Sequence, residues 1–230
     1  MEYEDLWIKL QRDIINCKKC ERLVKWRVAA SLNPPRRFKN WSYWAKPLPG
    51  FGDKDASILI VGLAPAAHGG NRTGRVFTGD RSGNNLMKAL YNVGLANHPY
   101  SISKNDGLKL RNLYITAVLR CPPPANKPLR EEIDNCREFL SKEIKLLRNV
   151  RVAVALGFIA YTNLLRTYRE LGYNIHAEKF RHGAMAKVYQ DNKLQYTILA
   201  SYHPSPHNVN TGRLSIVMLE EIFRKALRLA

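Results

Sequence analysis

A glycine-rich segment at residues 62–83 has the composition of a loop that closes around a ligand. It reads G-L-A-P-A-A-H-G-G-N-R-T-G-R-V-F-T-G-D-R-S-G. Glycine lets the backbone approach a bound molecule closely and adopt positive φ values. The segment is not a P-loop, because the Gly-Lys-Ser/Thr ending is missing. We therefore interpret it as one wall of a pocket that contains two polar candidates, His68 and Asp80.

A second segment, residues 201–213, brings two further histidines. It reads S-Y-H-P-S-P-H-N-V-N-T-G-R and follows a predicted strand, where a catalytic histidine would be held rigidly. On a helix, the spacing of His203 and His207 would place both on one face and suit a catalytic metal ion. Pro204 and Pro206 lie between them and argue against a helix. A metal-dependent nuclease or hydrolase is therefore an alternative, with a site formed by four residues: His68, Asp80, His203 and His207.

The four cysteines fall into two pairs, a C-x2-C at Cys17 and Cys20 and a C-x14-C at Cys121 and Cys136. In a reducing compartment, cysteines in this pattern are read as metal or cluster ligands before disulfides. Thiolates bind zinc or an iron–sulfur cluster, and the spacing alone favours zinc slightly. Either group would be a structural clamp between the N-terminal helix and the loop after the second predicted strand, with no ligand position left for substrate. Four buried structural thiols are the alternative.

The chain is strongly basic, since its 230 residues include 37 Lys and Arg against 19 Asp and Glu, a net charge of +18. Such an excess points to a polyanionic partner, with nucleic acid as the first candidate. Residues 36–46 alternate basic and aromatic side chains, which suits phosphate contact and base stacking. No apolar run is long enough to span a membrane, and residues 1–16 do not form a signal peptide. We expect an intracellular, cytoplasmic protein associated with the nucleoid.

Short apolar runs separated by helical stretches predict the elements that hold these segments. Strands are expected at 57–63, 112–119, 152–156 and 196–200. Helices are expected at 3–15, 84–94, 130–147, 158–172 and 212–229. We predict an α/β fold over residues 1–230, a single domain built as a three-layer α/β/α sandwich around a four-stranded parallel sheet.

The loops at the carboxyl ends of the strands are the expected place for chemistry in such a fold. Three of them are polar and rich in Gly and Pro, namely 64–83, 120–128 and 201–212. The loop after the third strand is not, and we expect it to be scaffold. Residues 31–54 contain many prolines and glycines and are expected to form a long loop.

Three features together resemble the type B, or family 5, uracil-DNA glycosylases: the glycine-rich segment, the H-P-S-P sequence at 203–206 and the two cysteine pairs. The run P-P-A-N-K-P at 123–128 belongs to the same resemblance, which covers about residues 17–213. The resemblance implies a uracil-DNA glycosylase-like three-layer fold and the removal of uracil from DNA. It also implies a 4Fe–4S cluster, in preference to zinc, with four ligands: Cys17, Cys20, Cys121 and Cys136. Many members of the wider superfamily carry Asp or Asn at the position of Ala64, which is apolar here as in the type B group.

The resemblance implies a pocket for a base that has been flipped out of the duplex. Phe77 would supply the stacking face, or would be an ordinary core residue. Asn126 can donate and accept, which matches O4 and N3–H of uracil, or would be a turn residue.

The resemblance also implies the groups that act on the bond. His203 is placed to donate to O2 as charge develops on the leaving base. Asp80 would orient water or stabilise positive charge on the sugar, or would cap a helix. Further base contacts are assigned to Leu63 and Ala64.

Contacts to the DNA backbone are expected from six residues: His68, Arg75, Ser205, Asn208, Thr211 and Arg213. No lysine has the surroundings of a Schiff-base nucleophile, so we expect hydrolysis by water that leaves an abasic site.

The expected partner is double-stranded or single-stranded DNA containing uracil. We expect a monomer to bind it, with a sliding clamp as a candidate protein partner and no membrane. Hypoxanthine and xanthine are further candidate substrates. A non-catalytic iron–sulfur protein that binds DNA is the remaining alternative.

Overall fold

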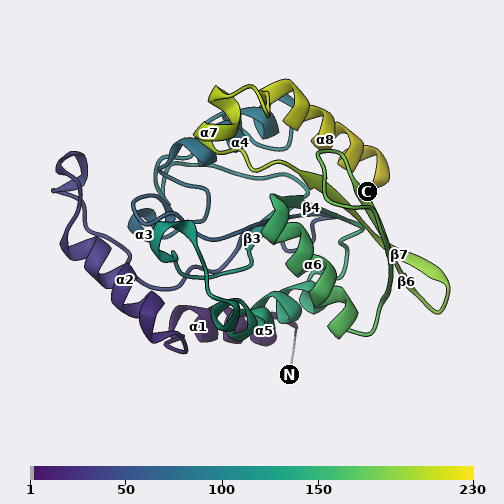
Figure 1. Cartoon of the computed structure of the whole chain (residues 1–230), viewed down its shortest axis with the longest axis horizontal. Coiled ribbons are helices and arrows are strands. Elements are labelled where there is room, and N and C mark those ends of the chain that lie inside the picture. The colour runs from purple at the N-terminus through teal and green to yellow at the C-terminus, as the bar shows by residue number, and fades with distance from the viewer. Residues whose placement is uncertain (1–2) are drawn as a thin grey trace.

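A mixed sheet of seven strands forms the centre of the computed structural model, which describes residues 3–230 (Figure 1). The strand order is β1-β3-β2-β4-β7-β6-β5. Four central strands pair in parallel: β3 (Leu113–Ala117), β2 (Ile58–Gly62), β4 (Val152–Leu156) and β7 (Lys193–Ser201). They are the four strands predicted from the sequence. Every residue of β2, β3 and β4 is buried, as expected for apolar strands that are covered on both faces.

The sheet is larger than the predicted four strands. At one edge, β1 (Phe51–Gly52) pairs antiparallel with β3, and at the other β6 (Met185–Gln190) and β5 (Asn174–Ala177) continue the sheet antiparallel to β7 and to each other. The hairpin between β6 and β7 turns through Asp191 and Asn192, whose φ values of 49° and 59° suit a tight two-residue turn. The apolar-run criterion missed these strands because β1 has two residues and the other two are mostly exposed or alternate buried with exposed residues.

Helices cover both faces of the sheet, and each face has its own apolar cluster (Figure 1). One face is covered by α1 (Tyr3–Ile15), α5 (Arg130–Leu146) and α6 (Phe158–Glu170). The opposite face is covered by α4 (Arg81–Asn92) and α8 (Ile216–Leu229). All five helices were predicted, and the three-layer α/β/α architecture is confirmed.

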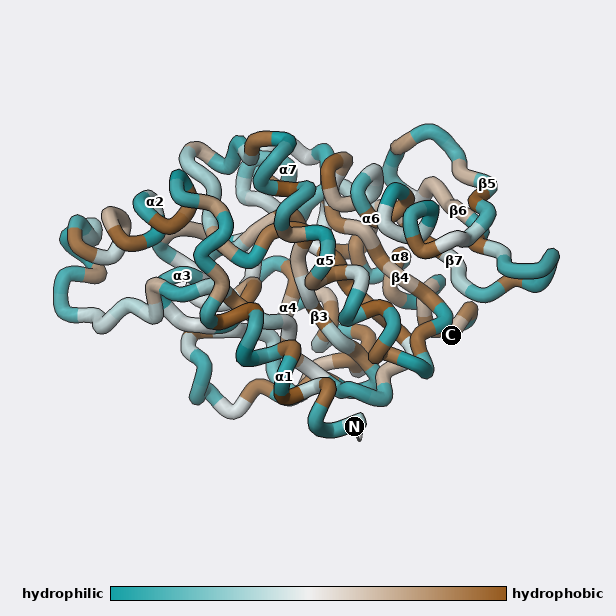
Figure 2. Tube along the Cα trace, turned by 90° about the horizontal axis from the view of Figure 1, so that it is seen from below, coloured by the Kyte–Doolittle hydropathy of each residue, from teal (hydrophilic) through white to brown (hydrophobic). Residues whose placement is uncertain are grey.

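Three helices were not predicted: α2 (Glu21–Leu32), α3 (Gly70–Thr73) and α7 (Pro206–Asn210). The last two are about one turn long and lie inside segments predicted as loops. The helix α2 lies at the periphery of the molecule (Figure 1), and Figure 2 shows that it nevertheless carries several hydrophobic residues. The long loop predicted at 31–54 is wrong at both ends, because α2 extends to Leu32 and β1 begins at Phe51.

The connection after β4 is a single residue, Gly157, before α6 begins. The loop that was predicted to be scaffold is thus reduced to this one residue. None of the helices within residues 3–230 combines the length and the apolar composition needed to cross a bilayer.

Candidate functional site

A pocket of about 420 Å³ opens where β2, β3 and β7 end and their loops meet. Parallel strands present their carboxyl ends at the same edge of the sheet, which is where ligands bind in open α/β folds. The structure brings all six residues predicted for catalysis and base binding together in the lining of this pocket: Leu63, Ala64, Phe77, Asp80, Asn126 and His203. The volume lies within the range of about 300–1,000 Å³ that is usual for small-molecule sites.

Phe77 forms one wall of the pocket in an unusual backbone conformation, with a φ of 50°. Two glycines leave room for it. A Cβ on Gly62 would lie 2.7 Å from two carbons of the Phe77 ring, and a Cβ on Gly83 would lie 2.2 Å from its carbonyl oxygen. The ring is 8% exposed and lies near His203, with 6.0 Å between the ring centroids and 29° between the planes. The glycines of the predicted loop therefore serve to place an aromatic ring.

Asp80 is the N-cap of α4 and also lines the pocket. Its Oδ1 accepts a hydrogen bond of 2.9 Å from the Gly83 N–H, so the cap expected as an alternative role is present. Burial raises the pKa of Asp80, while the N–H groups of Gly83 and Ser82 and the charge of Arg72 act in the opposite direction. The cap therefore fixes the position of a largely desolvated carboxylate beside the pocket.

His203 follows the last residue of β7 by two positions, so its backbone is held by the sheet. Its carbonyl oxygen accepts a hydrogen bond of 2.8 Å from Asn208 Nδ2. Burial lowers the pKa of His203 to about 4. The imidazole is thus neutral near pH 7 and offers one ring N–H to a ligand.

Asn126 reaches the pocket from the loop after β3, where Pro124–Asn126 form a 3-10 turn. Ala125 and Asn126 have φ values of 51° and 56°, a left-handed conformation that asparagine tolerates better than most residues. The side chain is exposed at the pocket. Both readings made from the sequence, a turn residue and a pocket residue, therefore apply.

Among the residues predicted to contact the DNA backbone, Ser205 and His68 line the two cavities, while Thr211 and Arg213 lie on the surface after α7. Ser205 lines the pocket and caps α7, accepting from the Asn208 N–H at 3.3 Å. Thr211 is exposed after α7, and the exposed Arg213 stacks its guanidinium 4.6 Å from the ring centroid of Tyr202. His68 lies in an adjoining groove, with its Nδ1 3.0 Å from the Tyr43 hydroxyl.

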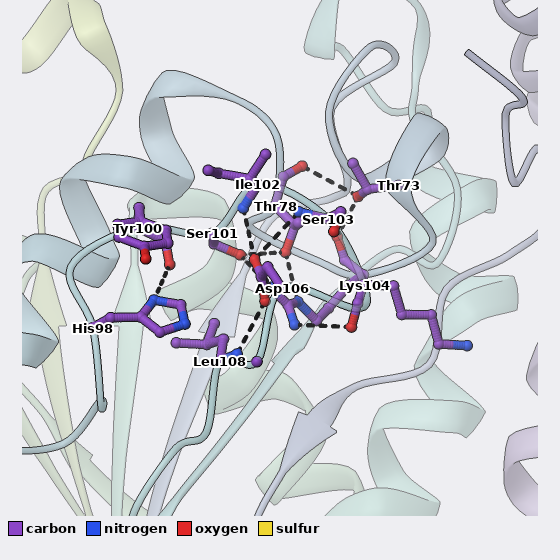
Figure 3. A network of polar contacts seen from close by, with 12 residues as sticks. Thr73, Thr78, His98, Tyr100, Ser101, Ile102, Ser103, Lys104, Asp106 and Leu108 are labelled. Carbon is purple, nitrogen blue, oxygen red and sulfur yellow. Dashed lines mark hydrogen bonds and ion pairs between the residues drawn. The ribbon is translucent and has the colours of Figure 1, made fainter.

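The prediction that Arg75 contacts DNA is not supported by the structure, because this side chain is buried. The side chain is 7% exposed, and its Nη2 is 2.7 Å from the carboxylate of Asp106. The same guanidinium donates to the hydroxyls of Thr78 and Ser101. Figure 3 shows Asp106 at the centre of this network, where it also accepts from the N–H groups of Ile102 and Leu108 at 2.7 and 3.0 Å. Arg75 stabilises the loops beneath the pocket.

The four cysteines, although far apart in sequence, lie in one apolar cluster between α1, α2 and α5. Burial raises the pKa of Cys121 to about 11 and of Cys136 to about 12, so both are protonated at neutral pH unless a metal displaces the protons. Three sulfurs accept hydrogen bonds: Cys121 from Arg27 Nη1 at 3.0 Å, Cys136 from the Arg120 N–H at 3.4 Å and Cys20 from Asn135 Nδ2 at 3.6 Å.

Within residues 3–230, no three His, Cys, Asp or Glu residues gather in a group that would hold a single metal ion. Zinc would need its sulfur ligands about 2.3 Å from one point, so the sulfurs are not arranged for zinc. The proposed catalytic metal set of His68, Asp80, His203 and His207 is not assembled either. His207 is exposed on α7 and does not line the pocket.

Several residues of the site were not predicted. Arg81 and Ser82 line the pocket directly after Asp80, and Pro206 lines it after Ser205. These three residues could have been predicted from their position next to predicted residues in the sequence. The role of Arg72 could not, because its contacts with Phe38 and Trp41 join segments about 30 residues apart.

Comparison with known proteins gives consistent matches over this region. The family model described as the uracil DNA glycosylase superfamily matches residues 49–228, which include the whole pocket but not Cys17 and Cys20. A Type-5 uracil-DNA glycosylase of Pyrobaculum aerophilum is 47% identical over 213 residues, covering 93% of this chain and 88% of that protein. One of Thermus thermophilus is 47% identical over 214 residues, with coverage of 93% and 94%. A Type-4 uracil-DNA glycosylase of Sulfurisphaera tokodaii is 26% identical over 224 residues, with coverage of 96% and 84%.

Proposed function

The chain belongs to the uracil-DNA glycosylase superfamily, and on that premise we propose that it hydrolyses the N-glycosidic bond of uracil in DNA and leaves an abasic site. The observation that carries the proposal is the composition of the pocket. An aromatic face, a partly buried carboxylate, an amide and a neutral imidazole converge in it from three loops. A flipped pyrimidine needs these groups: a surface to stack on, partners for its edge and a donor for the charge that it carries away.

Base recognition is assigned to the walls of the pocket. The uracil ring stacks on Phe77, and the Asn126 amide donates to O4 and accepts from N3–H. Leu63 and Ala64 close the pocket from the end of β2. Because Ala64 offers no side-chain polar group that would select for uracil, hypoxanthine and xanthine are proposed as further substrates.

Bond cleavage is assigned to His203 and Asp80. As the C1′–N1 bond breaks, its electron pair moves onto the base, and the neutral His203 N–H donates to O2. The sugar develops positive charge, which the Asp80 carboxylate stabilises by proximity. The oxygen of a water molecule oriented by Asp80 then bonds to C1′, and its proton passes to the carboxylate or to solvent. No lysine lines the pocket within the described residues, which supports water as the nucleophile.

Contacts with the DNA backbone are assigned to the pocket mouth. We propose that Ser205, Thr211 and Arg213 contact phosphates on either side of the flipped nucleotide, which the position of Ser205 in the pocket lining and the exposure of the other two support, while Asn208 holds the carbonyl of His203. Because the proposed substrate is DNA, we propose that the protein acts inside the cell in association with the nucleoid. Action as a monomer and contact with a sliding clamp remain predictions from the sequence.

A 4Fe–4S cluster is proposed as the group held by Cys17, Cys20, Cys121 and Cys136. The donor set suits it, because four thiols gather in an apolar environment and three of the sulfurs accept N–H hydrogen bonds of the kind that tune such clusters. The cluster would supply a structural clamp and no reaction step. The four ligands would join the start of α2, the loop after β3 and α5.

The test is a labelled oligonucleotide with one uracil, incubated with the protein in excess EDTA and then divided between samples with and without hot alkali. We expect cleavage only after alkali. Cleavage without alkali would indicate a lyase step, and activity that needs an added divalent ion would support the metal-dependent hydrolase instead.

A matched pair of variants connects the activity to the site. His203→Ala is expected to slow excision by about 100-fold or more, as for removal of one donor to a developing charge. His207→Ala removes an exposed imidazole on the neighbouring helix and is expected to leave the rate unchanged. A non-catalytic DNA-binding protein would give no excision with any of the three proteins.

A further inference from the structure

A second cavity, a groove of about 650 Å³, adjoins the base pocket and has no role in the proposed reaction. The two cavities share four lining residues: Ala66, Asp80, Arg81 and Asn126. The two cavities therefore border each other at these residues, and a strand with one nucleotide in the pocket would bring its neighbour to the groove. For a DNA strand, the next nucleotide is the natural continuation.

The groove has an aromatic wall that is open to solvent. Trp26 of α2 is 36% exposed and Trp41 is 41% exposed, and Phe38 lies beside them. Large aromatic faces exposed in one concave place are uncommon on a protein surface unless something binds there. Every nucleobase has a flat face that stacks on such rings regardless of its identity.

Two of the three rings, Phe38 and Trp41, pack against a cation that also lines the groove, Arg72. The guanidinium carbon of Arg72 lies 4.0 Å from the ring centroids of both Phe38 and Trp41. Arg72 is 4% exposed and donates to the carbonyl oxygens of His68 and Gly79, at 2.9 and 3.0 Å. Phe38 and Trp41 are thus tied through Arg72 to the loop that carries Asp80, which lowers the cost of ordering them when a base binds.

The charge of the groove suits a phosphodiester. Arg37 and Arg81 line it, and Asp80 is the one acidic residue among the described residues of the lining. Arg36 and Lys39 are exposed in the same segment as Arg37. Stacking faces next to a positive rim are the combination found where proteins bind single-stranded nucleic acid.

We propose that this groove binds the nucleotide next to uracil in the same strand, with its base stacked on Trp26 and Trp41 and its phosphate on Arg37 or Arg81. The inference rests on the proposed uracil excision and adds a second nucleotide to the substrate. The contact is independent of base identity. It acts on binding of the strand and not on the chemical step, because neither tryptophan lines the pocket that holds Phe77, Asp80 and His203.

The experiment uses single-stranded oligonucleotides that contain one uracil. In one substrate both neighbours carry bases, and in two others the 5′ or the 3′ neighbour is a tetrahydrofuran residue without a base. Trp26→Ala is compared with wild type and with Tyr91→Ala, which removes an exposed aromatic ring from α4 away from the groove. Stacking losses of this kind predict a KM about tenfold higher for Trp26→Ala on the first substrate, with kcat within about twofold.

The loss should disappear on whichever substrate lacks the stacked base, and Trp26→Phe should restore most of the binding. Equal losses on all three substrates, or no loss on any, would overturn the inference. Absence of excision by wild type on every uracil substrate would instead remove the proposed function. If Trp26→Ala lowers the unfolding temperature, the comparison is made with Trp41→Ala instead, and the same outcomes apply.

Discussion

At the scale of single residues, the position of the Asp80 carboxylate depends on a neighbour that has no side chain. A Cβ on Gly69 would lie 2.3 Å from Asp80 Oδ2 and 3.0 Å from its Cβ and Cγ. Contacts this short force one partner to move. The cap hydrogen bond to the Gly83 N–H is the interaction that such a movement would break first.

We therefore expect Gly69→Ala to slow uracil excision about 100-fold, because a displacement of about 1 Å in a reacting group can cost that much. Single-turnover rates on a uracil oligonucleotide measure the effect. The control is a double-mutant cycle with Asp80→Ala. If Gly69→Ala slows the reaction as much in that background as in wild type, the glycine serves something other than Asp80.

The pocket residues were largely predictable, and the reason lies in how the loops are placed. Phe77, Asp80 and His203 lie in polar segments that directly follow parallel strands, so the topology alone brings them to one edge. Arg75 was misplaced because its partner, Asp106, lies 31 residues further along the chain. Nothing in the local sequence shows that this arginine is neutralised by a carboxylate and buried.

The pKa of His203, lowered by burial to about 4, makes stability depend on pH. An unperturbed histidine in the unfolded chain has a pKa of about 6.5, so the unfolded chain binds one more proton between those values. The free energy of unfolding should therefore be unaffected above about pH 6.5 and fall as the pH drops toward 4. Between pH 7.5 and pH 4.5, the free energy of unfolding should therefore fall by about 2 to 3 kcal/mol less in His203→Asn than in wild type.

Urea unfolding of both proteins at pH 7.5 and pH 4.5 checks this. His207→Asn is the matched control, since that side chain is exposed on α7 and is expected to leave the pH dependence unchanged. The same acid sensitivity in wild type and in His203→Asn would show that His203 is not the group responsible.

At the scale of elements, apolar runs predicted the central strands and the five long helices, while caps decided where two helices begin. The helix predicted from 84 begins at Arg81 because Asp80 caps it, and the one predicted from 212 begins at Ile216 because Ser215 caps it. The helix α2 escaped prediction for a different reason, because two of its main anchors are polar. Arg22 forms a bidentate pair with Glu132 at 2.7 and 2.8 Å, and Arg27 reaches Cys121.

Arg27 connects α2 to two parts of the molecule. Its Nη1 donates to Cys121 Sγ at 3.0 Å, and its carbonyl oxygen accepts from Asn71 Nδ2 at 3.0 Å, next to the loop that carries His68. The side chain is 5% exposed. Loss of a buried hydrogen bond from a charged donor costs about 1.5–3 kcal/mol.

Arg27→Leu should therefore lower the midpoint of thermal unfolding by about 3–12 °C, given about 2–4 °C per kcal/mol for a domain of this size. Lys25→Leu on the same helix is the matched control. Its ion pair with Glu21 has side chains 75% and 80% exposed, so its loss should be nearly neutral. Equal shifts in the two variants would mean that the sulfur contact contributes nothing specific.

At the scale of the whole molecule, the net charge of +18 raises the question of whether it acts as a uniform field or at one surface. The two ends of the longest axis offer a comparison. The segment after α2, with the exposed Arg36 and Arg37, lies at one end, and the β6–β7 hairpin, with the exposed Lys187 and Lys193, lies at the other (Figure 1). Only the first end borders the groove next to the pocket.

If the charge acts near the groove, the basic residues beside it should contribute to the salt dependence of binding. We expect a plot of the logarithm of affinity for a uracil-free single strand against the logarithm of salt concentration to become less steep when these residues are removed. Each phosphate contact to single-stranded DNA contributes about 0.7 to the slope, so Arg36→Ala with Arg37→Ala should reduce it by about 1.4. Lys187→Ala with Lys193→Ala removes the same charge from the opposite end and should leave the slope unchanged. Fluorescence anisotropy between about 50 and 300 mM salt measures both. Equal reductions of the slope in the two double variants would show that the charge acts over the whole molecule. The single-stranded DNA would then have no preferred path along α2.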